Sequence, residues 1–146
     1  MKKVFLLAGL ALTSFVTFAS PDPSERVLKA FSETFKSAKE ITWHDYSDYM
    51  QANFKQDEVQ VRAQYSDDGT LIKTIRYYGA TQLLPTIVAK LNKKYPGKEI
   101  YGVTETVGED EVAFVINLKD DNHWYIVKSD MFGNLTQTDK FKRAEK

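Results

Sequence analysis

The order of hydrophobic periods constrains this chain most, because the same order occurs twice. Residues 22–35 place apolar side chains three and four residues apart, the period of a helix with one buried face, and Asp22 is the expected N-cap. Residues 50–78 then alternate apolar and polar side chains, as strands with one solvated face do. Residues 85–95 return to the helical period, and residues 99–141 form apolar runs separated by turns. The sequence therefore predicts an α+β protein in which a helix precedes antiparallel strands twice.

The two parts of the sequence also align with each other at nearly constant spacing. Apolar positions of the first helix recur 60 residues later, as the pairs Val27 and Ile87, Phe31 and Leu91, and Phe35 and Tyr95. A Lys-Glu-Ile strand start recurs at a spacing of 59 residues, and the turn that begins at Ser66 recurs at Ser129 with one additional residue. These matches favour an internal duplication, with halves at about residues 22–78 and 82–141. We expect each unit to be a helix followed by an antiparallel sheet of about four strands, and the two units to share one core, because units of about 60 residues bury little surface alone.

The first 19 residues have the three parts of a signal peptide. Two lysines precede the apolar run VFLLAGLAL, and TFA at positions 17–19 supplies the small residues of a cleavage site. Thr13, Ser14 and Thr17 interrupt the apolar run, which falls short of the ~20 residues that a membrane-spanning helix needs. We therefore predict cleavage near Ala19, a mature domain at residues 20–146 in the periplasm or secreted, and no stable membrane anchor.

Composition excludes several classes of protein. The chain has no cysteine, so it forms no disulfide, has no thiolate nucleophile and carries no lipidated cysteine. Its 20 basic and 20 acidic side chains balance, so no excess charge attracts a nucleic acid. We expect a globular exported domain without a nucleic-acid partner.

The sequence contains no recognisable catalytic or metal-binding motif. The only histidines, His44 and His123, are not spaced as metal ligands, and no nucleophile elbow, phosphate-binding loop or dinucleotide fingerprint occurs. The carboxylates at residues 109–111 and 120–121 fall between strands, where solvated turns are the simpler interpretation. We predict that the protein is not an enzyme and has no cofactor, no catalytic residue and no metal site. A metal-linked function would require His44 and His123 to converge.

Aromatic residues cluster beside both histidines. One interpretation places both tryptophans against the helices, and another places part of the set on the opposite sheet face as an anchor for a partner. The candidate binding residues are Trp43, His44, Tyr46, Tyr49, His123, Trp124 and Tyr125. Residues 112–117 are apolar on both faces of their strand, which indicates a central strand covered by the first-half sheet, a partner or a second copy of the chain. A homo-oligomer is therefore compatible with the sequence.

The second half also carries a family resemblance. The run LLPTIVAKLNKKYPGKEI, with Pro85 at the helix start and a Tyr-Pro-Gly exit at residues 95–97, precedes strands that end in the turn from Asp130 to Gly133. These motifs resemble the PepSY-like family of secreted bacterial proteins, also described as beta-lactamase-inhibitor-like. The resemblance implies a helix-plus-four-stranded unit used in tandem, and a binding or inhibitory role. Its motifs are structural, so they imply no catalytic residue.

We therefore expect a periplasmic binding module that recognises or inhibits a protein or peptide through its sheet face. The alternative is a carrier of a small apolar or aromatic ligand, which the density of tryptophan and tyrosine near the strands favours.

Overall fold

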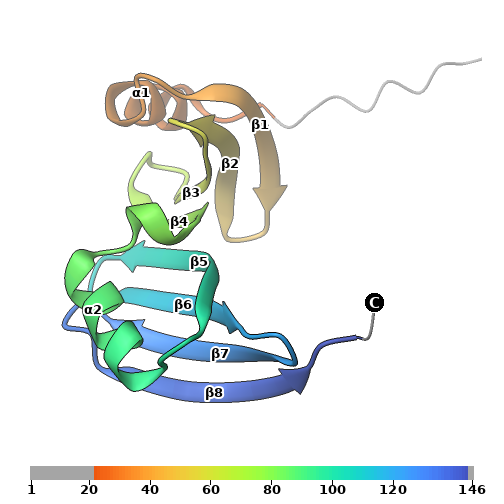
Figure 1. The fold of residues 1–146 in the computed structure, drawn as a ribbon. Helices are drawn as coiled ribbons and strands as arrows, with labels where there is room; N and C mark the ends of the chain where they lie inside the picture. Colours follow the sequence, from red (N-terminus) through yellow and green to blue (C-terminus); the bar gives the residue numbers. More distant parts are fainter. Residues whose placement is uncertain (1–21, 145–146) are drawn as a thin grey trace, which may run out of the picture.

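The computed structural model of the protein describes residues 22–144. It has two α-helices and one eight-stranded sheet in which every neighbouring pair is antiparallel and the strands follow the order of the sequence (Figure 1). The elements are α1 (Glu25–Thr34), β1 (Lys39–Tyr46), β2 (Tyr49–Gln56), β3 (Val59–Tyr65), β4 (Leu71–Tyr78), the 3₁₀ turn η1 (Ala80–Gln82), α2 (Pro85–Lys94), β5 (Glu99–Gly108), β6 (Val112–Lys119), β7 (His123–Asp130) and β8 (Leu135–Lys142). The predicted α+β class is confirmed, and the predicted signal peptide lies outside the described residues.

The two groups of four strands form one sheet. The sequence predicted about four strands in each half, but β4 pairs with β5 from Lys73 opposite Gly108 to Tyr78 opposite Val103. This pairing satisfies backbone groups that two separate sheets would leave exposed along their edges. Among the described strands, only β1 and β8 are therefore edges of the sheet.

Both helices cover the same face of this sheet. Directly opposed residues in an antiparallel pair face the same side. Val61, which packs with α1, lies opposite Arg76, and Tyr78 of the same strand lies opposite Val103, which packs with α2. We call this face the helix side. Neither helix covers the other face, which we call the open face and which carries Gln51, Arg62, Tyr77 and Trp124.

The buried residues form two clusters, which corrects the prediction of one shared core. Val27 and Phe31 of α1 pack on β2 and β3, whereas Ile87 and Leu91 of α2 pack on β5, β6 and β7. Tyr78 packs against both clusters. Eight strands at a spacing of ~4.8 Å form a sheet wider than two helices of ~10 Å diameter can cover. The strip of the helix side between the clusters is therefore only partly filled, and it contains a cleft lined by Phe35, Thr74 and Gln82.

Each half also packs a turn glycine against its own helix. Gly69 in the β3–β4 turn has φ +90°, and a Cβ atom there would lie 2.8 Å from the carbonyl oxygen of Arg26 in α1. Gly133 in the β7–β8 turn has φ +76°, and its Cβ would lie 2.8 Å from Cδ of Lys90 in α2. The side chain of Ser24, rather than the expected Asp22, caps α1, since its hydroxyl oxygen accepts a hydrogen bond from the amide of Val27 at 3.3 Å.

Candidate functional site

One aromatic group on the open face lies at the β1–β2 hairpin. The rings of Tyr46 and Tyr49 stack with centroids 4.8 Å apart. Beside them runs a chain of amides, in which Gln64 donates to Gln51 at 2.9 Å and Gln51 donates to Asn53 at 2.8 Å. The side chains of both glutamines are almost fully buried despite lying on this face. Satisfied buried amides hold one another in place, so this corner is a rigid polar and aromatic surface.

A second aromatic group on the open face lies at the other end of the sheet. The ring of Tyr101 meets Trp124 edge to face at 4.8 Å, and Phe141, which is 54% exposed, lies opposite Trp124 in β8. Two cations flank these rings: Nζ of Lys119 lies 4.9 Å from the Tyr101 ring, and the guanidinium of Arg143 lies 5.5 Å from the Trp124 ring. We call Tyr101, Trp124 and Phe141 the aromatic cluster.

The structure does not bring these two groups together. Strands β2 and β7 are five spacings apart, which is ~24 Å at the usual strand separation. The tyrosine pair also lies at the hairpin end of β1 and β2, whereas Trp124 lies beside the opposite ends of the strands, near the β6–β7 turn. Between them Tyr77 faces the open side with the guanidinium of Arg62 5.2 Å from its ring, beside a shallow pocket of about 290 Å³.

The remaining predicted site residues lie elsewhere. His44 lies opposite Gln51 and therefore shares the open face with the tyrosine pair. Trp43 is on the helix side, where its ring lies 5.2 Å from Phe31. Tyr125 is buried on the helix side, and its hydroxyl donates to Asp120 at 2.7 Å. Trp43 and Tyr125 are therefore packing residues of the two halves and do not belong to a patch on the open face.

His123 lies on the helix side, next to Tyr125, and its backbone amide donates to the Asp120 carboxylate at 2.7 Å. His44 is on the open face of β1, at the other edge of the sheet. The two histidines cannot therefore share a metal ion, which removes the metal-linked hypothesis. Within residues 22–144, no group of three or more histidine or carboxylate side chains is placed to hold a metal.

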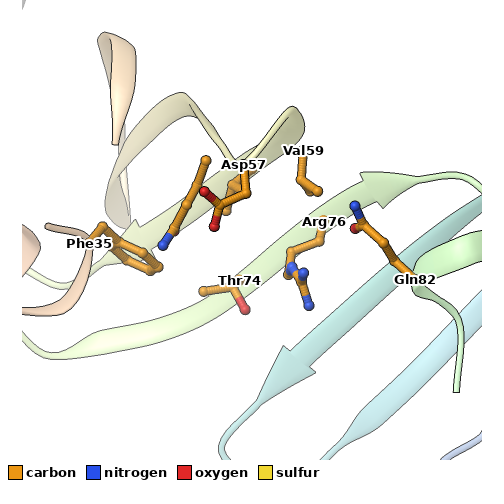
Figure 2. Close-up of a pocket in the computed structure, with 8 residues that line it drawn as sticks. Phe35, Asp57, Val59, Thr74, Arg76 and Gln82 are labelled. Atoms are coloured by element: carbon orange, nitrogen blue, oxygen red, sulfur yellow. The ribbon is translucent and has the colours of Figure 1, made fainter. Parts of the chain in front are cut away.

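The partly filled strip between the two core clusters contains a cleft of about 500 Å³ (Figure 2). Phe35 and Gln82 stand at its two sides, and Figure 2 shows the Asp57 carboxylate directed across it towards Thr74. Asp57 and Glu58 occupy the β2–β3 turn with φ of +48° and +63°, although neither is glycine. Such conformations cost about 1–2 kcal/mol each, so the turn holds Asp57 over the cleft at an energetic cost.

Arg76, one of the two charged residues that line this cleft, is held in an ion pair. Nη1 of Arg76 donates to Oε1 of Glu105 at 3.1 Å, the hydroxyl of Tyr78 donates to Oε2, and the Glu105 side chain is only 13% exposed. Burial, together with this hydrogen bond to Glu105, raises the pKa of Tyr78 well above its usual value. Both carboxylate oxygens of Glu105 are thus occupied, so the group is placed to hold Arg76 and Tyr78 in position.

Sequence reasoning missed Tyr101, Phe141 and the Arg76–Glu105 pair. Tyr101 lies at a bulge between Ile100 and Gly102, which changes the alternation of faces along β5. A pattern based on strict alternation assigns such a residue to the wrong side. The only sequence signal for Phe141 was its place in a strand that is otherwise polar after Leu135.

No family model matches the chain, and no curated protein sequence matches it. Solved structures do resemble it. A BLIP-like protein from Bacteroides fragilis matches with a TM-score of 0.67 and 15% identity over 86% of this chain and 91% of the other. A DUF2874 family protein from Bacteroides ovatus matches with a TM-score of 0.63 and 18% identity over 84% of this chain and 89% of the other. A protein from Bacteroides eggerthii, assigned provisionally to the periplasm, matches with a TM-score of 0.62 and 12% identity. The match covers 84% of this chain and 90% of the other.

At these identities the similarity shows the fold alone. The chain thus has the fold of a BLIP-like protein, while the PepSY-like name stays a prediction. None of the three descriptions names an enzyme. Neither described helix has the length and apolar character needed to cross a membrane.

Proposed function

We propose that this protein is an exported periplasmic module that binds a protein or peptide through the open face of its sheet. The observation that carries the proposal is the aromatic cluster of Tyr101, Trp124 and Phe141, flanked by cations on a face that neither helix covers. Aromatic and arginine side chains provide most of the binding energy at protein interfaces. The signal-peptide pattern of residues 1–19 supports export.

The dimensions of the open face favour a macromolecular partner over a small ligand. The tyrosine pair and the aromatic cluster are ~24 Å apart across the strands, and an eight-residue strand is ~26 Å long. A partner that contacted both groups would cover roughly 600 Å², close to the ~800 Å² that each protein contributes to a standard interface. The buried amide chain beside the tyrosine pair fixes the strands that carry these rings. Inhibition of the partner would follow if this contact covered the partner's own active site.

The proposal is tested by purifying the mature chain from its own host and identifying the protein that co-purifies with it. We expect Trp124→Ala and Tyr101→Ala to lose the partner, because removal of an interface aromatic costs about 2 kcal/mol or more, which is roughly 30-fold in affinity. Lys93→Gln, on the exposed surface of α2, is the matched control and should keep it. Retention of the same partner by all three variants would contradict binding through the open face.

A further inference from the structure

A groove on the helix side runs between α1 and the edge strand β1. Its volume is about 630 Å³, within the ~300–1,000 Å³ range of small-molecule sites. Aromatic rings line its base: Phe31 lies 5.2 Å from Trp43 and 5.5 Å from Phe35. Leu28 of α1 and Ile41 of β1 also line the groove and are 44% and 43% exposed. Large apolar side chains from both elements are thus left uncovered here.

The sheet topology explains why the groove is open. In the second half, β4 lies beside β5, and Tyr78 of β4 packs against the core cluster of α2. In the first half, β1 is the edge of the sheet, and no described strand pairs with its outer side. The apolar side chains under α1 are therefore accessible from this edge.

Two cations border the apolar groove, one in α1 and one in the segment that follows α1. Lys29 and Lys36 line the groove, and within residues 22–144 neither forms a salt bridge. Glu40, the acidic residue of β1 nearest to the groove in sequence, is already paired with Lys55 at 2.7 Å. Glu33 of α1 is exposed but does not line the groove. The rim therefore offers positive charge to a ligand.

The backbone of β1 disfavours an added strand as the occupant. The register of β1 shifts between Lys39 and Thr42, and Glu40 within this bulge has φ +55°. Bulges interrupt the regular row of hydrogen-bonding groups that an additional strand would need. An occupant that binds through apolar contact and one charged group suits this edge better.

We propose that this groove binds a single-chain anionic amphiphile. Its hydrocarbon chain lies against Leu28, Phe31 and Ile41, and its anionic head group lies between Lys29 and Lys36. Each buried methylene group raises affinity about fourfold, which corresponds to about 0.8 kcal/mol. Because the groove and the open face are on opposite sides of the sheet, this site is independent of the proposed protein partner, and either proposal can fail alone.

The first experiment titrates the mature chain carrying Trp124→Phe with decanoate below its micellar concentration. Trp43 is then the only tryptophan and reports on the groove by fluorescence. We expect a saturable change in emission, with an affinity that rises about 16-fold for each two added carbons from octanoate to dodecanoate until the groove is full. Decylammonium, which has the same chain and the opposite charge, should bind at least about tenfold more weakly.

The second experiment separates the head-group contact from general charge effects. Lys29→Gln with Lys36→Gln should weaken decanoate binding about tenfold while the circular dichroism spectrum stays unchanged. Lys93→Gln with Lys128→Gln removes the same charge from exposed positions elsewhere and should leave the affinity as it was. The proposal is overturned if emission does not saturate, if decylammonium binds equally well, or if sedimentation shows that a second copy of the chain fills the groove.

Discussion

The turn glycine Gly69 gives the sharpest test of how the first half is assembled. Alanine at this position would keep φ +90°, which costs about 1–2 kcal/mol for a residue with a side chain. Its Cβ would also lie 2.8 Å from the carbonyl oxygen and 3.0 Å from the carbonyl carbon of Arg26. Both atoms belong to the backbone of α1, so the turn and the helix must separate, which costs about 1–3 kcal/mol more. We expect Gly69→Ala to lower the free energy of unfolding by about 2–5 kcal/mol.

Two other glycines in the left-handed region separate these contributions. Gly97 has φ +74° with no atom within 4 Å of its would-be Cβ, so Gly97→Ala should show the conformational cost alone, about 1 kcal/mol. Gly133 meets the flexible side chain of Lys90, whose Nζ donates to the carbonyl of Phe132 at 2.7 Å. Gly133→Ala should lie between the other two, because Lys90 can move away at the expense of that hydrogen bond.

The measurement is urea unfolding of the mature chain, followed by circular dichroism with the slope m held in common. The midpoint should fall in the order Gly97→Ala, Gly133→Ala, Gly69→Ala, from the smallest decrease to the largest. Equal effects of Gly69→Ala and Gly97→Ala would show that the β3–β4 turn does not pack on α1, and the reasoning would be refuted. A change in m for Gly69→Ala alone would indicate that α1 has detached in the native state.

Three further predictions concern single side chains. Tyr65→Phe should leave the free energy of unfolding unchanged or raise it by about 1 kcal/mol, because the Tyr65 hydroxyl is fully buried without a partner in the described part of the chain. A loss of about 1 kcal/mol or more in urea unfolding would show that the hydroxyl does have a hydrogen-bond partner. Trp43→Ala should cost about 3 kcal/mol and Trp124→Ala less than about 1 kcal/mol, and equal melting temperatures would contradict their placement on opposite faces. Hydrogen bonds from the Tyr125 hydroxyl and from backbone amides hold the pKa of Asp120 well below its usual range, so its stabilising effect is present above the unfolded pKa of about 3.9 and is lost as pH falls through the lower folded value. Asp120→Asn should therefore lower the melting temperature at pH 7, and the difference from the parent should shrink below about pH 3; a difference that does not depend on pH would contradict this origin.

The strongly periodic elements were predictable from the sequence. The stripe of Val27 and Phe31 and that of Ile87 and Leu91 are the buried faces of α1 and α2, as predicted. The start of α1 was placed too early, because Asp22 and Ser24 are both good N-caps and only the local geometry selects Ser24. The β2–β3 turn gave no signal, since Asp57 and Glu58 take left-handed conformations that usually require glycine or asparagine.

The side of the sheet on which each aromatic residue lies was less predictable. β6 and β7 carry apolar side chains on both sides, so alternation could not assign Trp124 and Tyr125 to a face. The register supplies that information: Tyr125 lies opposite the buried Leu118, and Trp124 lies opposite Lys119. The separation of the two cores also lies outside local sequence patterns, because it depends on the pairing of β4 with β5. The resemblance anticipated a fold that a solved BLIP-like protein also has. The binding role of the predicted residues stays a prediction.

The strand order has a consequence for the kinetics of folding. Every strand pairs with its neighbour in sequence, so most pairings close short loops, which favours rapid formation of each group of four strands. The pairing of β4 with β5 is the exception, because residues 79–98, including α2, must be bridged first. Among the strand pairings of the sheet, this one has the largest entropic cost of loop closure. We expect it to form last, so that a brief stage of folding exposes β4 and β5 as two additional unpaired edges at which newly exported chains are most prone to aggregate.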